Sequence, residues 1–186
     1  MCNNNAIIKY TVEDIIKRFH DEKPEFLFFW GHTVKSEITK ACFSQWFPCQ
    51  FKEDSITYTT AEHYMMAEKA RLFNDHDILE DIMQAESPNQ AKKLGRKIKD
   101  FNPEIWDQHK YELVKQGNFL KFSQDESLKK FLLSTGDKIL VEASPYDSIW
   151  GIGMLDADPR VNNPALWKGE NLLGFALMEV RDELKG

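Results

Sequence analysis

A strong helix signal lies in the stretch TTAEHYMMAEKARLF, residues 59–73. Good helix formers follow two threonines, and Thr59-x-x-Glu62 has the spacing of a capping box, in which the glutamate bonds back to the helix start. Glu62 and Lys69 are seven residues apart, about 700° of helix rotation, so they share one face with Met66 between them. The stretch predicts a helix that points a carboxylate and an amine at one place. A cap for Glu62 and a solvated surface position for Lys69 are the structural alternatives.

Signals on both sides of this stretch divide the chain without a linker or repeat. Residues 26–30 and 55–58 predict strands before it, and residues 138–143 predict a strand after it. Further helices are expected after Thr11, Ser87, Asn102 and Ser123, the last ending near Gly136, and over residues 171–181. These elements predict one α+β domain, predominantly helical with a few short strands. Residues 1–25 are expected to form a peripheral N-terminal helix of that domain, and residues 26–186 its main body.

Composition and charge limit the classes of function. With 186 residues, 42% of them hydrophobic and 29% charged, the chain can bury one globular core. The net charge of −6 argues against tight, sequence-independent nucleic-acid binding, which needs many lysine and arginine contacts to phosphates. The basic residues from Lys92 to Lys99 have the spacing of a solvated helix side. No segment approaches the roughly 20 apolar residues that cross a bilayer, and Met1–Asn5 lacks a signal-peptide pattern, so we expect a cytoplasmic protein without a membrane partner.

Metal and redox sites are not expected. Cys2, Cys42 and Cys49 are odd in number and lack CxxC spacing, so they are predicted to be free thiols. His63 has no second histidine or acid at the helical spacing of a zinc motif.

The segment SPYDSIWGIG, residues 144–153, is expected to be a loop directly after a strand. It carries Asp147 and Trp150 in a tight turn, and loops held by a rigid strand often display functional groups. Gly151 and Gly153 without a third glycine and a following helix are a weak phosphate-binding signal. They serve either unusual backbone angles or close approach of a ligand.

Several ordered motifs resemble those of a known family. They are Phe29-Trp30-Gly31-His32, Tyr58-x-Thr60-Ala61-Glu62-His63-Tyr64-Met65-Met66-Ala67-Glu68-Lys69-Ala70, Leu94-Gly95-Arg96, Gly117-Asn118-x-x-Lys121-Phe122, Leu132-Leu133-x-Thr135-Gly136-Asp137, Leu140-Val141-Glu142-Ala143-Ser144-Pro145-x-Asp147-x-x-Trp150-Gly151-Ile152-Gly153 and Trp167-x-Gly169-x-Asn171-Leu172-Leu173-Gly174. Over roughly residues 26 to 184 the chain resembles the NADAR family, also called YbiA-like, whose members are N-glycosidases. The resemblance implies a YbiA-like fold and cleavage of a C1′–N bond to ribose.

The resemblance places the family's active-site positions at Glu62, Lys69, Asp147 and Trp150. N-riboside cleavage builds positive charge at C1′ and O4′, which carboxylates can stabilise. We expect Glu62, Lys69 and Asp147 to be catalytic, Lys69 either as a Schiff-base nucleophile or as a phosphate ligand. The expected substrate-binding residues are Trp30, Gly31, His32, Trp46, Asn118, Lys121, Trp150 and Asn171. Asn118, Lys121 and Asn171 have a cap or a surface position as the alternative, and no cofactor is called for.

The sequence is compatible with three functions. One is hydrolysis of a ribosylaminopyrimidine phosphate of early riboflavin biosynthesis, a small phosphorylated partner. The second is removal of ADP-ribose from guanine in DNA or RNA, which the net charge of −6 favours less. The third is a module that binds ADP-ribose without cleaving it. Such a module is expected to have lost an acid or the lysine, whereas Glu62, Lys69 and Asp147 are all present.

Overall fold

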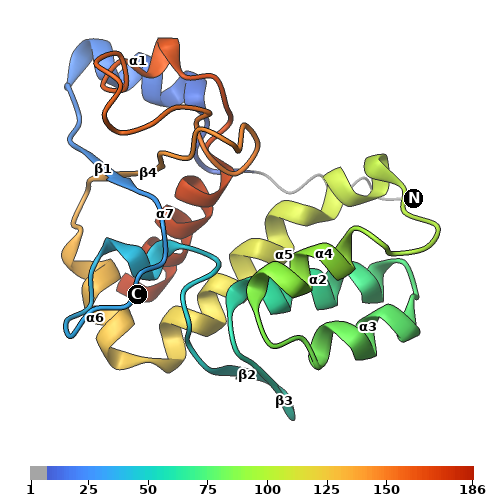
Figure 1. The fold of residues 1–186 in the computed structure, drawn as a ribbon. Coiled ribbons are helices and arrows are strands. Elements are labelled where there is room, and N and C mark those ends of the chain that lie inside the picture. Colours follow the sequence, from blue (N-terminus) through green and yellow to red (C-terminus); the bar gives the residue numbers. More distant parts are fainter. Residues whose placement is uncertain (1–7) are drawn as a thin grey trace.

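Two strands that are far apart in the sequence pair in the computed structural model, which describes residues 8–186. β1 (Phe26–Phe29) lies parallel to β4 (Ile139–Glu142), with Phe29 opposite Glu142 (Figure 1). Ile139, Leu140 and Val141 are fully buried, as is typical of strands covered on both faces. Because parallel strands end at the same edge of a sheet, the segments after Phe29 and after Glu142 leave the sheet together.

Helices make up most of the regular secondary structure in residues 8–186. They are α1 (Val12–Asp21), α2 (Ala61–Leu72), α3 (His76–Met83), α4 (Pro88–Gly95), α5 (Pro103–Gln124), α6 (Glu126–Ser134) and α7 (Leu172–Lys185). The antiparallel pair β2 (Phe51–Glu53) and β3 (Ile56–Tyr58) and the 3-10 turns η1 (Lys40–Phe43) and η2 (Pro164–Leu166) are short. The predicted α+β single domain, predominantly helical with a few short strands, is confirmed.

Helix α7 packs closely on β4 and also contacts α5. A Cβ at Gly174 would lie 2.1 Å from the carbonyl oxygen of Leu140, so only glycine permits this approach. From Leu172 to Arg181 every residue of α7 is buried, which makes it the central helix of the sheet side. Figure 1 shows α7 between the β1–β4 pair and α5.

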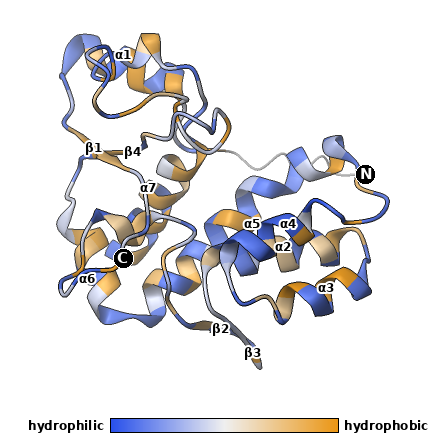
Figure 2. Cartoon of the chain, in the orientation of Figure 1, coloured by the Kyte–Doolittle hydropathy of each residue, from blue (hydrophilic) through white to orange (hydrophobic). Residues whose placement is uncertain are grey.

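Helix α2 is the centre of a second group, in which it contacts α3, α4 and α5. Eight of its twelve residues are buried, so its neighbours cover it on several sides. Gly95 allows α4 to approach, because a Cβ there would lie 2.1 Å from Sδ of Met66 on α2. Figure 2 shows the outer turns of α4 and α5 as mainly hydrophilic, as expected for helices that cover a buried one.

Most predicted element boundaries agree with the structure. Side chains of Thr11, Ser87 and Asn102 cap their helices as expected. Two starts differ. Thr60, not Thr59, caps α2, and Asp125 caps α6 because α5 continues past Ser123 to Gln124. Helix α3 and strand β2 have no counterpart among the predicted elements.

The N-terminal helix α1 packs against η2, and its Ile15 is fully buried. Just before it, the backbone N–H of Lys9 donates to Oε1 of Glu179 on α7, at 2.9 Å. The helix is therefore tied to the main body, although the division at residue 25 stays a prediction. Cys42 and Cys49 are free thiols, and Cys2 lies outside the described residues. Nowhere in residues 8–186 is a helix both long and apolar enough to cross a membrane.

Candidate active site

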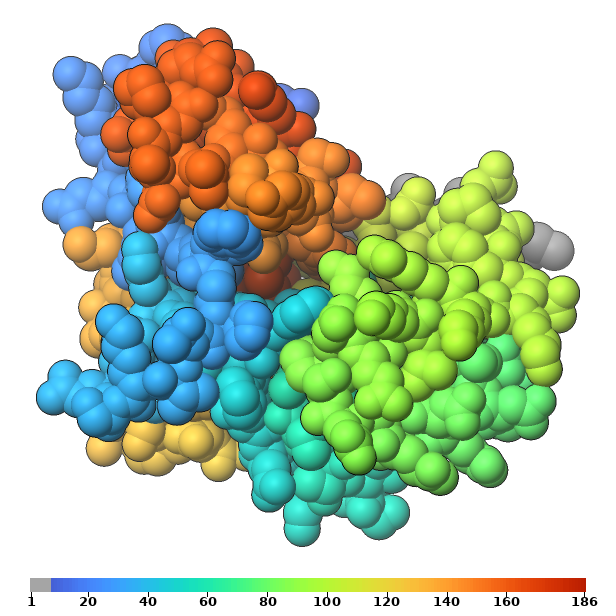
Figure 3. Space-filling model, in the orientation of Figure 1, coloured from blue at the N-terminus to red at the C-terminus, as the bar shows by residue number. Residues whose placement is uncertain are grey.

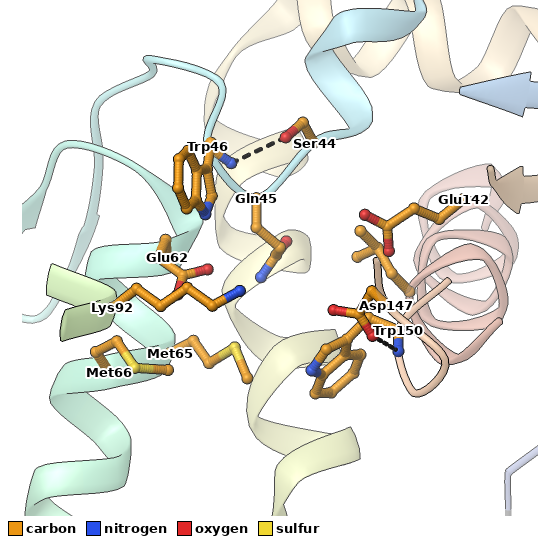
Figure 4. Close-up of a pocket in the computed structure, with 11 residues that line it drawn as sticks. Ser44, Gln45, Trp46, Glu62, Met65, Met66, Lys92, Glu142, Asp147 and Trp150 are labelled. Carbon is orange, nitrogen blue, oxygen red and sulfur yellow. Dashed lines mark hydrogen bonds between the residues drawn. The ribbon is translucent and has the colours of Figure 1, made fainter. Parts of the chain in front are cut away.

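A cavity lies where the ends of β1 and β4, the first turns of α2, and α4 meet. Its inner part, of about 120 Å³, is lined by Ser44, Gln45, Trp46, Glu62, Met65, Met66, Lys92, Glu142, Asp147, Trp150 and Leu173. An outer cleft of about 410 Å³ adjoins it and adds Trp30, Gly31, His32, Ser144 and Tyr146. Figure 3 shows the hollow between the blue segment after β1, the orange loop after β4 and the green α4, and Figure 4 shows the inner side chains.

Glu62 lies in the first turn of α2 and points into the inner cavity (Figure 4). Its side chain makes no capping box, because Thr60 caps the helix and accepts the N–H of His63 at 3.2 Å. Burial raises the pKa of Glu62 to about 7, although Lys92 and the side chain of Trp46 act in the opposite direction. Its carboxyl group is thus poised to exchange a proton near neutral pH.

Glu142, the last residue of β4, is a second carboxyl group in the cavity. Burial and then the neighbouring carboxylate of Asp147 raise the pKa of Glu142 to about 8. Its Oε2 atom is buried and has no hydrogen-bond partner among residues 8–186. Glu142 lies in one of the quoted motifs but is not among the predicted site residues. The available signal was an acid at the end of an otherwise apolar strand, immediately before the loop.

Asp147 and Trp150 are carried by the predicted loop, and both line the inner cavity. Oδ1 of Asp147 accepts the backbone N–H groups of Ile149 at 2.9 Å and Trp150 at 2.8 Å, which fixes the turn. Gly151 fits beneath it, since a Cβ there would lie 2.8 Å from the carbonyl oxygen of Glu142. The structure therefore brings Glu62, Asp147 and Trp150 together in one cavity, as the resemblance implies, and their roles there stay a prediction.

Lys69 does not join them. Its Nζ donates to the carbonyl oxygen of Gly95 at 3.1 Å and lies 4.0 Å from the centre of the Phe101 ring. Burial, and secondarily the charge of Arg96, lowers the pKa of Lys69. Glu62 and Lys69 do share the face of α2 that meets α4, but the expectation that they point at one place is not met. The amine lies two turns away and holds the end of α4.

The amine that lines both the cavity and the cleft is Lys92 on α4. It is half-buried, and its charge lowers the pKa of both Glu62 and Glu142. Helical spacing predicts a solvated helix side for both Lys92 and Lys93. Lys93 is exposed as expected, whereas Lys92 is half-buried and lines the cavity.

Three predicted substrate-binding residues support the cavity from outside its lining. Two of them lie on α5. Nδ2 of Asn118 donates to Oε1 of Gln45 at 2.8 Å, and Nζ of Lys121 donates to the carbonyl oxygen of Ser44 at 2.9 Å. Asn171, fully buried at a positive φ of 56°, accepts the N–H of Glu142 and donates to the carbonyl oxygen of Leu140, each at 2.9 Å. All three position residues that face the cavity.

The other four predicted binding residues, Trp30, Gly31, His32 and Trp46, line the outer cleft, and Trp46 also lines the inner cavity. The rings of His32 and Trp46 are 5.5 Å apart, and those of Trp30 and Tyr146 are 6.1 Å apart. Trp30 is 51% exposed, so its face is open to a flat ligand. Gly31 has a positive φ of 80°, which turns the chain between the two aromatic residues.

Within residues 8–186 no three histidine, cysteine or acidic side chains lie close enough to hold a metal ion, and this includes the three acids of the cavity. His63 is buried and both of its ring nitrogens have protein partners. Nδ1 lies 2.8 Å from Oγ1 of Thr60, and Nε2 lies 3.0 Å from the carbonyl oxygen of Ala85. His63 therefore has a structural role.

Comparisons with known proteins identify the family and support the fold. A family model described as the NADAR domain matches residues 28–185. N-glycosidase R617 of Acanthamoeba polyphaga mimivirus is 48% identical over 168 residues, covering 87% of this chain and 98% of the viral protein. The chloroplastic riboflavin biosynthesis protein PYRR of Zea mays is 34% identical over 140 residues, covering 72% of this chain and 21% of that protein. The NMR structure of the Escherichia coli protein YbiA superposes with a TM-score of 0.70 at 29% identity, covering 87% of this chain and 86% of YbiA.

Proposed function

The chain belongs to the NADAR domain family and is a glycosyl hydrolase of the N-glycosidase kind, and we propose that its substrate is a ribosylaminopyrimidine phosphate of the riboflavin pathway. The similarity to a riboflavin biosynthesis protein supports this choice, as does the net charge of −6, which disfavours long nucleic-acid ligands. In the reaction the C1′–N bond breaks, the oxygen of water joins C1′, and the leaving nitrogen gains a proton. The products are ribose 5-phosphate and the free base.

The single observation that carries the proposal is the meeting of Glu62, Glu142 and Asp147 in one cavity with aromatic walls. Burial raises the pKa of Glu62 to about 7 and that of Glu142 to about 8, and two interacting carboxyl groups that titrate near neutrality can serve as a base and an acid. Glu62, ionised first, activates water or stabilises the oxocarbenium-like sugar. Glu142, which keeps its proton longer, protonates the leaving nitrogen.

Asp147 positions the sugar hydroxyls beside these two groups. Trp46 and Trp150 stack on the heterocycle, a contact worth about 1–3 kcal/mol per base. His32 and Trp30 extend this aromatic surface into the outer cleft.

In this mechanism the functional amine is that of Lys92, because Lys92 lines the cavity and Lys69 does not. It either forms a Schiff base with C1′ of the ring-opened sugar or binds the phosphate. Reductive trapping with borohydride separates the two: a covalent adduct at Lys92 identifies the imine. If the wild-type protein forms no adduct and Lys92→Met has an increased KM, Lys92 is a phosphate ligand.

The decisive assay incubates the purified protein separately with the ribosylaminopyrimidine phosphate and with DNA that carries ADP-ribosylated guanine. We expect the higher kcat/KM on the small substrate. Glu62→Gln should lower kcat by about 10²–10⁴. The matched control is Glu68→Gln on the same helix, since Glu68 pairs with Arg71 outside the cavity lining.

Each other outcome assigns a different function. A higher kcat/KM on the modified DNA identifies an ADP-ribosyl-guanine hydrolase. Binding of ADP-ribose without turnover of either substrate identifies a non-catalytic module. Full activity of Glu62→Gln removes Glu62 from the mechanism.

A further inference from the structure

Within the described residues, the amide of Gln45 carries an unpartnered donor in the cavity, where Glu142 carries an unpartnered oxygen. Gln45 is 9% exposed and lines the inner cavity, yet its Nε2 is buried and meets no acceptor anywhere in residues 8–186. A buried donor without a partner destabilises a fold by about 1–3 kcal/mol. A donor kept in that state at the wall of a cavity is explained by a ligand that accepts its hydrogen bond.

The direction of this donor is fixed from α5. Nδ2 of Asn118 donates to the backbone carbonyl of Val114 and to Oε1 of Gln45, each at 2.8 Å. A carbonyl can only accept, so the Val114 oxygen determines that the nitrogen of Asn118 faces these partners. The oxygen of Gln45 must then face Asn118, which leaves Nε2 on the cavity side. If both amides were flipped, Oδ1 of Asn118 would face the carbonyl oxygen of Val114, and two acceptors cannot form a hydrogen bond.

The backbone of the same segment is held next to Glu62. The carbonyl oxygen of Gln45 accepts the N–H of Glu62 at 3.0 Å, and that of Ser44 accepts from the buried amine of Lys121 at 2.9 Å. Figure 4 shows the Gln45 amide in the space between Glu62 and Asp147. Nε2 therefore has a fixed position relative to the carboxyl group of Glu62.

The chemistry of the lining indicates what this donor binds. Ribose hydroxyls can donate to Glu62, Glu142 and Asp147, so the sugar finds partners in the cavity without Gln45. A ring carbonyl can only accept. Lys92 can also donate, but it is a cation beside two acids, whereas Nε2 is a neutral donor with no partner of its own.

We propose that Nε2 of Gln45 donates to a ring carbonyl oxygen of the leaving heterocycle, with Asn118 as its positioning residue. The proposal rests on the N-glycosidase function above and specifies the class of base, an oxo-substituted ring rather than an amino-substituted one. Both an aminopyrimidinone and guanine carry such a carbonyl. As the C1′–N bond breaks, electrons move into the ring and the carbonyl oxygen becomes more negative, so the hydrogen bond strengthens in the transition state.

The test compares binding of two free bases by calorimetry. One is the triaminopyrimidinone that the proposed reaction releases, and the other is its tetraaminopyrimidine analogue, in which an amino group replaces the carbonyl. The wild-type protein should bind the pyrimidinone about tenfold more tightly, as one hydrogen bond to a buried donor provides. Gln45→Met, of similar volume but without a donor, should abolish the preference. Asn118→Leu should reduce it, because the Gln45 amide is then free to turn.

Met65→Leu is the matched control, since Met65 lines the same cavity without a polar group. It should change the affinity for both bases equally. Gln45→Met should also lower kcat on the ribosylated substrate more than it raises KM, and should leave the thermal midpoint unchanged or higher. A wild-type protein without the preference, or a Gln45→Met or Gln45→Leu variant that keeps it, would overturn the proposal.

Failure of the proposed function gives a different result. Suppose that neither ribosylated substrate is hydrolysed, but the preference for the pyrimidinone still depends on Gln45. The role of Gln45 in binding the ring carbonyl is then supported, and the proposed hydrolysis is refuted. If hydrolysis is observed and the preference is absent, only the role of Gln45 is refuted.

Discussion

Glu62 and Glu142 line one cavity, and in the proposed mechanism their raised pKa values should set the pH dependence of catalysis. With Glu62 required ionised and Glu142 required protonated, kcat/KM should rise with pH up to about 7 and fall above about 8. The two limbs belong to the interacting pair and not to either residue alone. Measured from about pH 5 to 10, each limb should approach a tenfold change per unit. Glu142→Gln should lose the alkaline limb together with much of the rate, and a flat wild-type profile would contradict these roles.

The same two residues predict a pH-dependent stability. In the unfolded chain both ionise near the ordinary value of 4.5, whereas the folded protein keeps their protons up to about 7 and 8. Their contribution is therefore fully present below pH 4.5, falls as pH rises to about 8, and is constant above that. Glu62→Gln and Glu142→Gln should each increase the free energy of unfolding at about pH 9 by on the order of 1–3 kcal/mol relative to wild type. Near pH 4 urea titrations should show little difference, and equal effects at both pH values would refute the argument.

The contact between α2 and α4 depends on one glycine. The Cβ of Gly95→Ala would meet Sδ of Met66 at 2.1 Å, so either α4 moves or the Met66 side chain is displaced. Because Met66 and Lys92 both line the cavity, we expect a loss of about 1–3 kcal/mol in stability and a lower kcat/KM. Adding Met66→Ala makes room for the new methyl group and should recover part of the stability. Denaturant titrations of the single and double variants measure this, and equal stability of the two would contradict the contact.

The elements that could be predicted are those whose signals are local. Thr11 caps its helix through a side-chain bond, and the strands at 26–30 and 138–143 are short apolar runs. Helical spacing also gave the correct face of α2. It could not show that α4 would cover only part of that face, so that Glu62 reaches the cavity while Lys69 meets the carbonyl of Gly95.

The rest of the site depends on contacts that are distant in the sequence. The orientation of the Gln45 amide depends on its bond to Asn118, 73 residues away. The raised pKa of Glu142 depends on its burial and on Asp147. Asn171 belongs to a quoted motif and is predicted to bind substrate, but its role as the clamp on the end of β4 is visible only once α7 has packed there.

At the scale of the whole molecule, the cavity lies between two groups of elements. The parallel pair and α7 supply Glu142, Asp147 and Trp150, while α2 and α4 supply Glu62 and Lys92. Helix α5 contacts both groups, through α2 and through α7. It also bonds the Ser44–Trp46 segment that closes the cavity between them. Relative movement of the two groups would separate the acids, so α5 is the element that keeps the site assembled.

The salt dependence of catalysis would distinguish the two enzymatic functions, because they differ in the number of phosphates that the protein contacts. The chain carries a net charge of −6, but α4 and the segment after it carry a basic surface made of Lys92, Lys93, Arg96, Lys97 and Lys99. Of these, Lys92 lines the cavity and Lys99 pairs with Asp77. A substrate with a single phosphate displaces few counterions. A nucleic-acid strand that contacts several phosphates displaces about 0.7–0.9 per contact.

We therefore expect the logarithm of kcat/KM to fall with the logarithm of salt concentration with a slope of about −1 or shallower. The slope should become shallower still in Lys92→Met, because Lys92 lines the cavity. It should not change in the paired control Lys93→Gln/Lys97→Gln, since both of those lysines are exposed outside the cavity lining. A slope steeper than about −3 that weakens in this control would assign the basic surface of α4 to a nucleic-acid backbone, and with it the reaction to ADP-ribosylated guanine.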